Sequence, residues 1–199
     1  NAIATTQKKG FVKINSDSSK QIKETFFNDK MEGKELFGSF SDGILDSLAI
    51  YGMSKTLYNI FEDSLYKGNN NVSGDTTIIG FSDNKLNSIT VIGGAEGIYL
   101  PDPSTNKIDF PVKYSADKMN YLFKNKKTDL YGNSSINHDN TSLESGYINI
   151  DWKKDFLTAL PNSNNNLKNE TILFPIIKEK NKDPMTGSQM TYNLKTKKG

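Results

Sequence analysis

The residues best suited to binding a metal ion lie in a long polar stretch, 125–146. Oxygen-bearing side chains at alternate positions of a loop can wrap a hard cation, and a Glu at the end of the loop can bind it through both carboxylate oxygens. Position six of the loop is His138, where a calcium loop usually has Gly. The sequence predicts no obligate cofactor, and calcium is its one candidate, with Asp139 and Glu144 as carboxylate ligands. Positions one, three, five, seven and twelve are Asn133, Ser135, Asn137, Asp139 and Glu144.

Aromatic side chains offer a second kind of site. Tyr and Trp combine an apolar ring with a polar tip, which suits them to sugar rings and to protein surfaces. Tyr131 is isolated within the polar stretch, and Tyr99 and Trp152 are further candidates for contact with a partner. For Trp152 there is an alternative, because its spacing with Phe156 and Leu160 also suits a helix anchored on a sheet.

Paired carboxylates are the groups most suited to catalysis. Asp42 with Asp46, and Asp151 with Asp155, have the spacing of successive helical turns and could support glycoside hydrolysis. Such pairs are also typical of solvated helix ends. The chain has no Cys and a single His, which excludes a thiol nucleophile and a thiolate metal site. Binding is therefore expected in preference to catalysis, and no catalytic residue is assigned.

The composition argues against a nucleic-acid partner. All 25 basic residues are Lys, and 23 acidic residues leave a formal net charge of +2. Arg is the side chain that reads phosphates and guanine edges with two parallel hydrogen bonds, and it is missing here. No apolar run approaches the roughly 18 residues that a membrane-spanning helix needs. The sequence thus predicts neither a nucleic-acid partner nor a transmembrane segment.

The segment Thr76–Tyr114 predicts an antiparallel β-meander. Short runs rich in β-branched and aromatic residues alternate there with Gly, Asn, Asp and Pro. The former suit a pleated surface and the latter suit its turns. The predicted strands are Thr76–Phe81, Ser88–Ile92, Gly97–Leu100 and Ile108–Tyr114.

The first third of the chain shows helical spacing instead. Ile22, Phe26 and Phe27 predict a helix from about Ser19 to Met31. The segment Ser41–Lys67 predicts a helix broken near Gly52. The alternative is a hairpin turned at Gly52, with strands Leu48–Tyr51 and Leu57–Phe61.

Two shorter helices are expected later in the chain. One follows Tyr114, and the other starts at Asp151 and ends before Pro161. The first carries Met119, Leu122 and Phe123. No internal repeat is recognised.

These elements predict an α+β fold, with a β-rich antiparallel meander as the core and N-terminal helices packed on it. We expect one α+β domain over 3–199, with a helical subdomain at 16–67 and a strand-rich part at 76–195.

The predicted function is that of a non-enzymatic secreted or cell-surface module from a low-GC bacterium. Its role would be structural or one of adhesion and recognition, and its partner a protein or glycan on a cell surface. The long polar loops support this prediction, because binding residues often lie on such loops. Two alternatives remain: a carboxylate-dependent hydrolase of extracellular or cell-wall polysaccharide, and a subunit of a pilus or phage-tail-like assembly.

Overall fold

The structure is a computed structural model that describes residues 2–16, 19–106, 108–162 and 173–199. Every regular element in these ranges is a β-strand, so the predicted α+β class and its N-terminal helices are wrong. No helix that could span a membrane occurs in the described part of the chain. The strands are β1 Ala2–Ser16, β2 Ser19–Gly33, β3 Glu35–Ser41, β4 Ile44–Glu62, β5 Leu65–Ser82, β6 Lys85–Pro101, β7 Val112–Leu122, β8 Lys127–His138, β9 Thr141–Asp151, β10 Phe156–Leu160, β11 Ile176–Glu179, β12 Met185–Thr186 and β13 Met190–Asn193.

These strands form one sheet whose centre is an antiparallel meander from β4 to β9. Several connections are two-residue turns with positive φ at both positions: Asp42-Gly43, Asp63-Ser64 and Asp83-Asn84. Turns of this kind match the right-handed twist of paired strands, and Asp, Asn and Gly tolerate them best. The chain therefore reverses at these Asp-led pairs. At Gly52, where a broken helix or alternatively a hairpin turn was predicted, β4 continues through a bulge.

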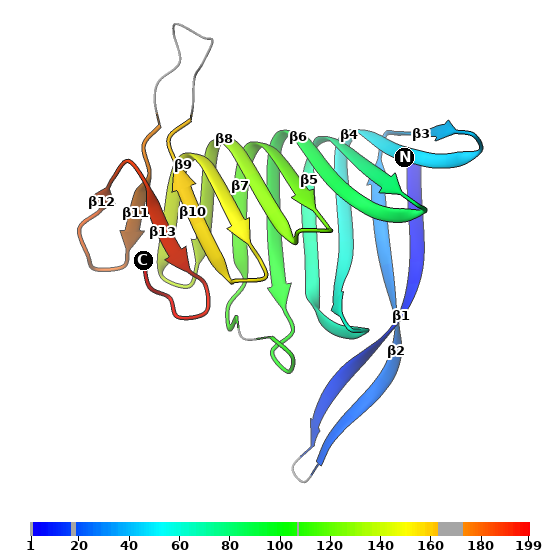
Figure 1. Cartoon of the computed structure of the whole chain (residues 1–199), viewed down its shortest axis with the longest axis horizontal. Coiled ribbons are helices and arrows are strands. Elements are labelled where there is room, and N and C mark those ends of the chain that lie inside the picture. Colours follow the sequence, from blue (N-terminus) through cyan, green and yellow to red (C-terminus); the bar gives the residue numbers. More distant parts are fainter. Residues whose placement is uncertain (1, 17–18, 107, 163–172) are drawn as a thin grey trace, which may run out of the picture.

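Bulges at matching positions break each central strand into two halves. A bulge bends its strand, and Figure 1 shows the strands curving over so that the sheet folds into two layers. We call the halves next to β3 and β10 the first layer and the halves next to β2 and β11 the second layer. The first layer contains 44–51, 76–82, 85–92, 118–122, 127–131 and 147–151, and the second contains 54–62, 65–73, 95–101, 112–115, 134–138 and 141–145.

The bulges reveal an internal repeat that is not recognisable in the sequence. Three strands carry a pair of residues with positive φ: Gly52-Met53, Gly93-Gly94 and Gly132-Asn133. These pairs recur at intervals of about 40 residues, the length of one long hairpin of the meander. The repeated unit is therefore a bent strand pair.

The core lies between the two layers. Inward side chains come from alternate positions of every central strand, and the rows continue from strand to strand across the sheet. The first layer contributes mostly aliphatic residues, whereas the second adds several buried tyrosines. The largest fully buried side chains include Ile50, Ile79, Ile89, Met119, Leu130, Ile148 and Leu157.

A bulge also explains why β7 resembled a helix in the sequence. Across a bulge the inward positions are three or four residues apart instead of two, as from Ile50 to Ser54 in β4. In β7 the same break separates Ala116 from Met119. A spacing of three or four is the usual mark of a helix. Ser19–Met31 is part of β2, which pairs with β1 without a bulge, and the predicted helix at Asp151 is a turn followed by β10.

Candidate functional site

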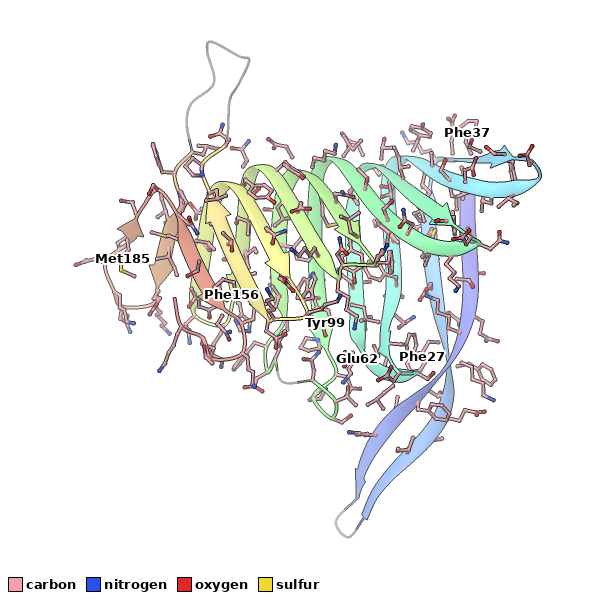
Figure 2. All side chains as sticks on the ribbon, viewed as in Figure 1. Phe27, Phe37, Glu62, Tyr99, Phe156 and Met185 are labelled. Atoms are coloured by element: carbon pink, nitrogen blue, oxygen red, sulfur yellow. The ribbon has the colours of Figure 1, made fainter. Side chains whose placement is uncertain are left out.

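An interior cavity lies between the two layers, near the strand ends opposite the bends. Its volume is about 670 Å³. Glu62 and Tyr99, which line it, lie on the side of the molecule away from the bends (Figure 2). The second layer contributes Tyr58, Ile60 and Tyr99, and the first layer contributes Leu86, Tyr121, Phe123 and Trp152.

Contacts between rings hold the cavity wall in place. The Tyr121 and Phe123 rings meet edge to face with centroids 4.7 Å apart, and Tyr58 lies 5.9 Å from Tyr121. On the other side, Tyr99 and Trp152 meet edge to face at 5.2 Å. The Trp152 Nε1–H donates to the Thr128 hydroxyl at 2.7 Å, so the indole has a fixed orientation. These aromatic pairs join the two layers and form an apolar wall.

A buried amide links two tyrosines behind this wall. The Asn70 amide nitrogen donates to the Tyr58 hydroxyl at 2.7 Å, and the Tyr114 hydroxyl donates to the Asn70 carbonyl oxygen at 2.8 Å. All three residues are buried. Burial raises the pKa of both tyrosines above the ordinary value, so both rings stay neutral.

Charged side chains surround the mouth of the cavity. Four lysines line it together with the carboxylates of Glu62 and Asp155. Hydrogen bonds from Lys126 and then from Lys67 lower the pKa of Glu62, so this carboxylate stays ionised. The site thus combines an apolar interior with a predominantly cationic rim, whose lysines are Lys8, Lys67, Lys126 and Lys153.

A second hollow lies on the outer face of the second layer. Its volume is about 650 Å³, and its floor carries outward side chains such as Lys55, Glu96, Ser115 and Asn137. Apart from Tyr114, whose side chain is buried, this hollow has no aromatic lining residue among those described. It offers fewer means of holding an apolar ligand than the interior cavity.

The structure brings together two of the three aromatic residues that the sequence singled out. Tyr99 and Trp152 are in ring contact and both line the cavity. Trp152 lies in the turn after β9. Tyr131 is 42% exposed on the outer face of the first layer, where its ring packs against Tyr147. Tyr131 therefore belongs to a different surface.

The proposed calcium ligands lie along a hairpin and do not encircle one point. Asp139 is in the β8–β9 turn and pairs with Lys197 at 3.2 Å, whereas Glu144 is in β9 and pairs with Lys178 at 2.7 Å. Asn133 is six residues before Asp139 along an extended strand, a span of roughly 20 Å. Among the described residues, no group of three or more His, Asp or Glu side chains is placed to hold a metal. Calcium binding stays a prediction, without support from this arrangement.

Several residues of the cavity were missed in the sequence. Tyr121 and Phe123 fall in a segment predicted as a helix. Lys67 ends the segment predicted as a broken helix and Lys126 lies in the polar stretch 125–146, and neither was assigned a role. A signal was available for Tyr121, because Met119 and Tyr121 alternate in the way that an inward-facing strand requires. Nothing in the sequence places Lys126 beside Glu62, because 64 positions separate them.

No family model matches this sequence, and no curated protein matches it either. A similar solved structure is that of LptH from Pseudomonas aeruginosa, described as the LptA homologous periplasmic component of the conserved lipopolysaccharide transport device. The two share 12% sequence identity with a TM-score of 0.58, over 75% of this chain and 93% of that chain. At this identity the similarity concerns the fold, and the chain accordingly has an LptA-like β-jellyroll.

Proposed function

We propose that this chain is a non-enzymatic carrier that binds an amphiphile between the two layers of its jellyroll. The cavity is the observation that supports this function. Its aromatic and aliphatic walls suit an acyl chain, and the lysines at its mouth suit a polar or anionic headgroup. A volume of about 670 Å³ falls within the usual range for small-molecule sites.

Lipopolysaccharide is the first amphiphile to test. LptH, whose fold this chain shares, is a component of a lipopolysaccharide transport device and is periplasmic. We infer by analogy that this chain acts in the periplasm and not at the cell surface. The adhesion role expected from the sequence gains no support from the fold.

A hydrolase is a less favourable interpretation of the same cavity. Glycoside hydrolysis needs one carboxylic acid with a raised pKa that can donate a proton to the leaving group. Glu62 has the opposite property, because Lys126 and Lys67 lower its pKa. Its two lysine partners favour binding of a negative charge over acid catalysis.

Trp152 allows a direct test, because it is the only tryptophan in the chain and lines the cavity. We expect lipopolysaccharide, added below its aggregation threshold, to change Trp152 emission in a saturable way. Polysaccharide stripped of its acyl chains should leave the emission unchanged. Absence of a saturable response to lipopolysaccharide and to simpler long-chain amphiphiles would contradict the carrier function.

Matched variants separate the cavity from the outer surface. Phe123→Asp introduces a charge into the apolar wall and should weaken amphiphile binding by about tenfold or more. Tyr131→Asp makes a similar change on the outer face of the first layer and should leave the affinity as it was. Equal effects of both variants would show that the amphiphile binds elsewhere. Near-UV circular dichroism checks that each variant retains its fold.

A further inference from the structure

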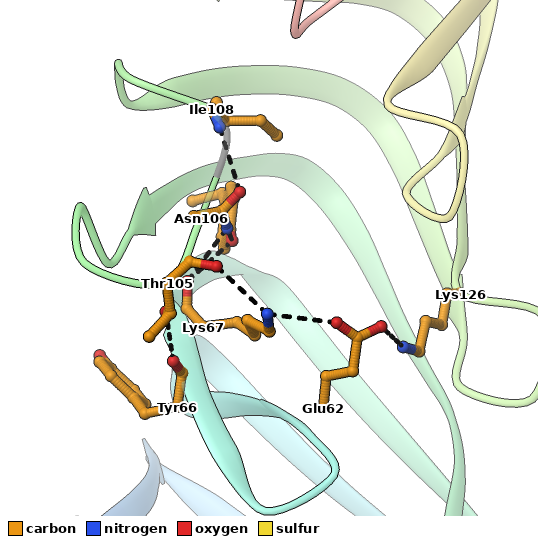
Figure 3. A network of polar contacts seen from close by, with 8 residues as sticks. Glu62, Tyr66, Lys67, Thr105, Asn106, Ile108 and Lys126 are labelled. Carbon is orange, nitrogen blue, oxygen red and sulfur yellow. Dashed lines mark hydrogen bonds and ion pairs between the residues drawn. The ribbon is translucent and has the colours of Figure 1, made fainter. Parts of the chain in front are cut away.

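One carboxylate at the mouth of the cavity is shared by lysines from opposite layers. Glu62 ends β4 in the second layer, and its two oxygens lie 3.2 Å from the Lys67 ammonium and 3.2 Å from the Lys126 ammonium. Lys126 comes from the β7–β8 turn, on the edge of the first layer. Figure 3 shows the carboxylate between the two ammonium groups. The ion pair between Glu62 and Lys126 therefore joins the two layers on the side of the molecule opposite the bends.

The loop between β6 and β7 fixes the position of Lys67. Its ammonium donates to the Thr105 carbonyl oxygen at 3.1 Å. Its own carbonyl oxygen accepts hydrogen bonds from the Tyr99 hydroxyl at 3.0 Å and from the Asn106 amide at 3.1 Å. Tyr99 is also part of the aromatic wall. The cationic position and the apolar interior are thus connected through a few direct contacts.

The ion pairs of Glu62 are weak enough for a competing anion to replace its carboxylate. The Glu62 side chain is 53% exposed, and the Lys126 side chain is 38% exposed. Ion pairs with this much exposure contribute little to stability. A phosphate has three acceptor oxygens and up to two negative charges, so it can replace a carboxylate between two ammonium groups.

We propose that Lys67 and Lys126 bind the anionic headgroup of the carried amphiphile, and that Glu62 occupies this position until the headgroup displaces it. This inference rests on the carrier function proposed above. The ligand is then an anionic amphiphile, with a phosphate or a carboxylate close to its acyl chain. Displacement of Glu62 also releases the contact between the two layers and opens the mouth of the cavity.

The test compares two amphiphiles with the same alkyl chain, an alkyl phosphate and an uncharged alkyl glucoside. Dissociation constants come from Trp152 emission, and the quantity compared is the preference for phosphate over glucoside. Glu62→Gln removes the competing charge and should raise this preference by about threefold to tenfold. Replacing Lys67 and Lys126 together by Gln should reduce the preference towards one, and high salt should act in the same direction.

Glu144→Gln and Lys178→Gln are matched controls, because these residues form a similar exposed pair on β9 and β11. Both should leave the preference unchanged. If both amphiphiles bind but Glu62→Gln leaves the preference unaltered, the headgroup position is wrong and the carrier function stands. If neither amphiphile changes Trp152 emission, the carrier function itself fails. Lys126→Gln alone, at a more exposed site, checks the result should the double variant be unstable.

Discussion

At the scale of single residues, Asn70 is a buried polar group that supports the apolar interior. It satisfies two buried tyrosine hydroxyls, those of Tyr58 and Tyr114. Asn70→Ala should lower the free energy of unfolding by about 2–4 kcal/mol, because both hydroxyls lose a partner inside the core. Urea denaturation measures the loss.

The neighbouring Asn71 is a suitable control for that measurement. Its side chain points to the outer face, is only half-buried and donates to Asn69. Asn71→Ala should cost less than about 1 kcal/mol. Similar losses at the two positions would show that the hydroxyls find other partners when Asn70 is removed.

His138 makes the stability of the protein depend on pH. It is 1% exposed, and its Nε2 has no hydrogen-bond partner within the described structure. Desolvation is the largest cause that lowers the pKa of His138, and the charge of Lys197 lowers it further. The charges of Asp139 and Asp109 raise it. Because the folded pKa lies below the unfolded value of about 6.5, His138 contributes stability above that pH and loses it as the pH falls.

A His138→Leu variant tests this dependence without interference from another histidine. Wild type should lose stability relative to the variant below about pH 6.5, at up to about 1.4 kcal/mol per pH unit. Urea denaturation of both proteins at pH 7.5, 6 and 5 gives the difference. Parallel curves over this range would mean that the folded protein binds the proton without a penalty.

At the scale of elements, the paired bulges determine where each strand bends. Gly93 has a φ of 81°, and a Cβ built on it would lie 2.3 Å from a carboxylate oxygen of Asp75 on the neighbouring strand. Gly94 has a φ of 63° but faces open space. Gly94→Ala should therefore cost about 1 kcal/mol from backbone strain alone, and Gly93→Ala about 2 kcal/mol or more.

Thermal and urea unfolding of the two variants checks this order. Asp75→Gly in the Gly93→Ala background should recover part of the extra loss, because it removes the side chain that clashes. Equal losses for Gly93→Ala and Gly94→Ala would contradict a steric role for Asp75 at the bulge.

The same bulges limited what could be predicted from sequence. The runs Thr76–Phe81, Ser88–Ile92 and Gly97–Leu100 do lie in strands, because each falls within one half of a bent strand and keeps its period of two. The helices after Tyr114 and at Asp151 were wrong because their patterns crossed a bulge or a turn. The helix Ser19–Met31 was wrong for another reason, because Ile22 and Phe26 are exposed side chains of a strand without a bulge. Tyr99 and Trp152 were identified by residue type, but their contact depends on the folding of the sheet, which no local pattern encodes.

At the scale of the whole molecule, burial of tyrosines between the two layers connects stability with alkaline pH. Burial raises the pKa of several of them, and it raises the pKa of Tyr121 to about 12. In the unfolded chain a tyrosine ionises near pH 10. Between these values the unfolded state loses its proton first, so stability is complete below about pH 10 and falls as the pH rises further.

Tyr121→Phe isolates one such contribution, because the ring contacts with Phe123 and Tyr58 can persist without the hydroxyl. Between pH 10 and 12, wild type should lose up to about 1.4 kcal/mol per pH unit relative to this variant. Lysine deprotonation affects both proteins alike and cancels in the difference. Urea unfolding at pH 8, 10 and 11 provides the comparison. A constant difference would mean that water already reaches Tyr121 in the folded state, and hence that the interior opens more readily than its packing implies.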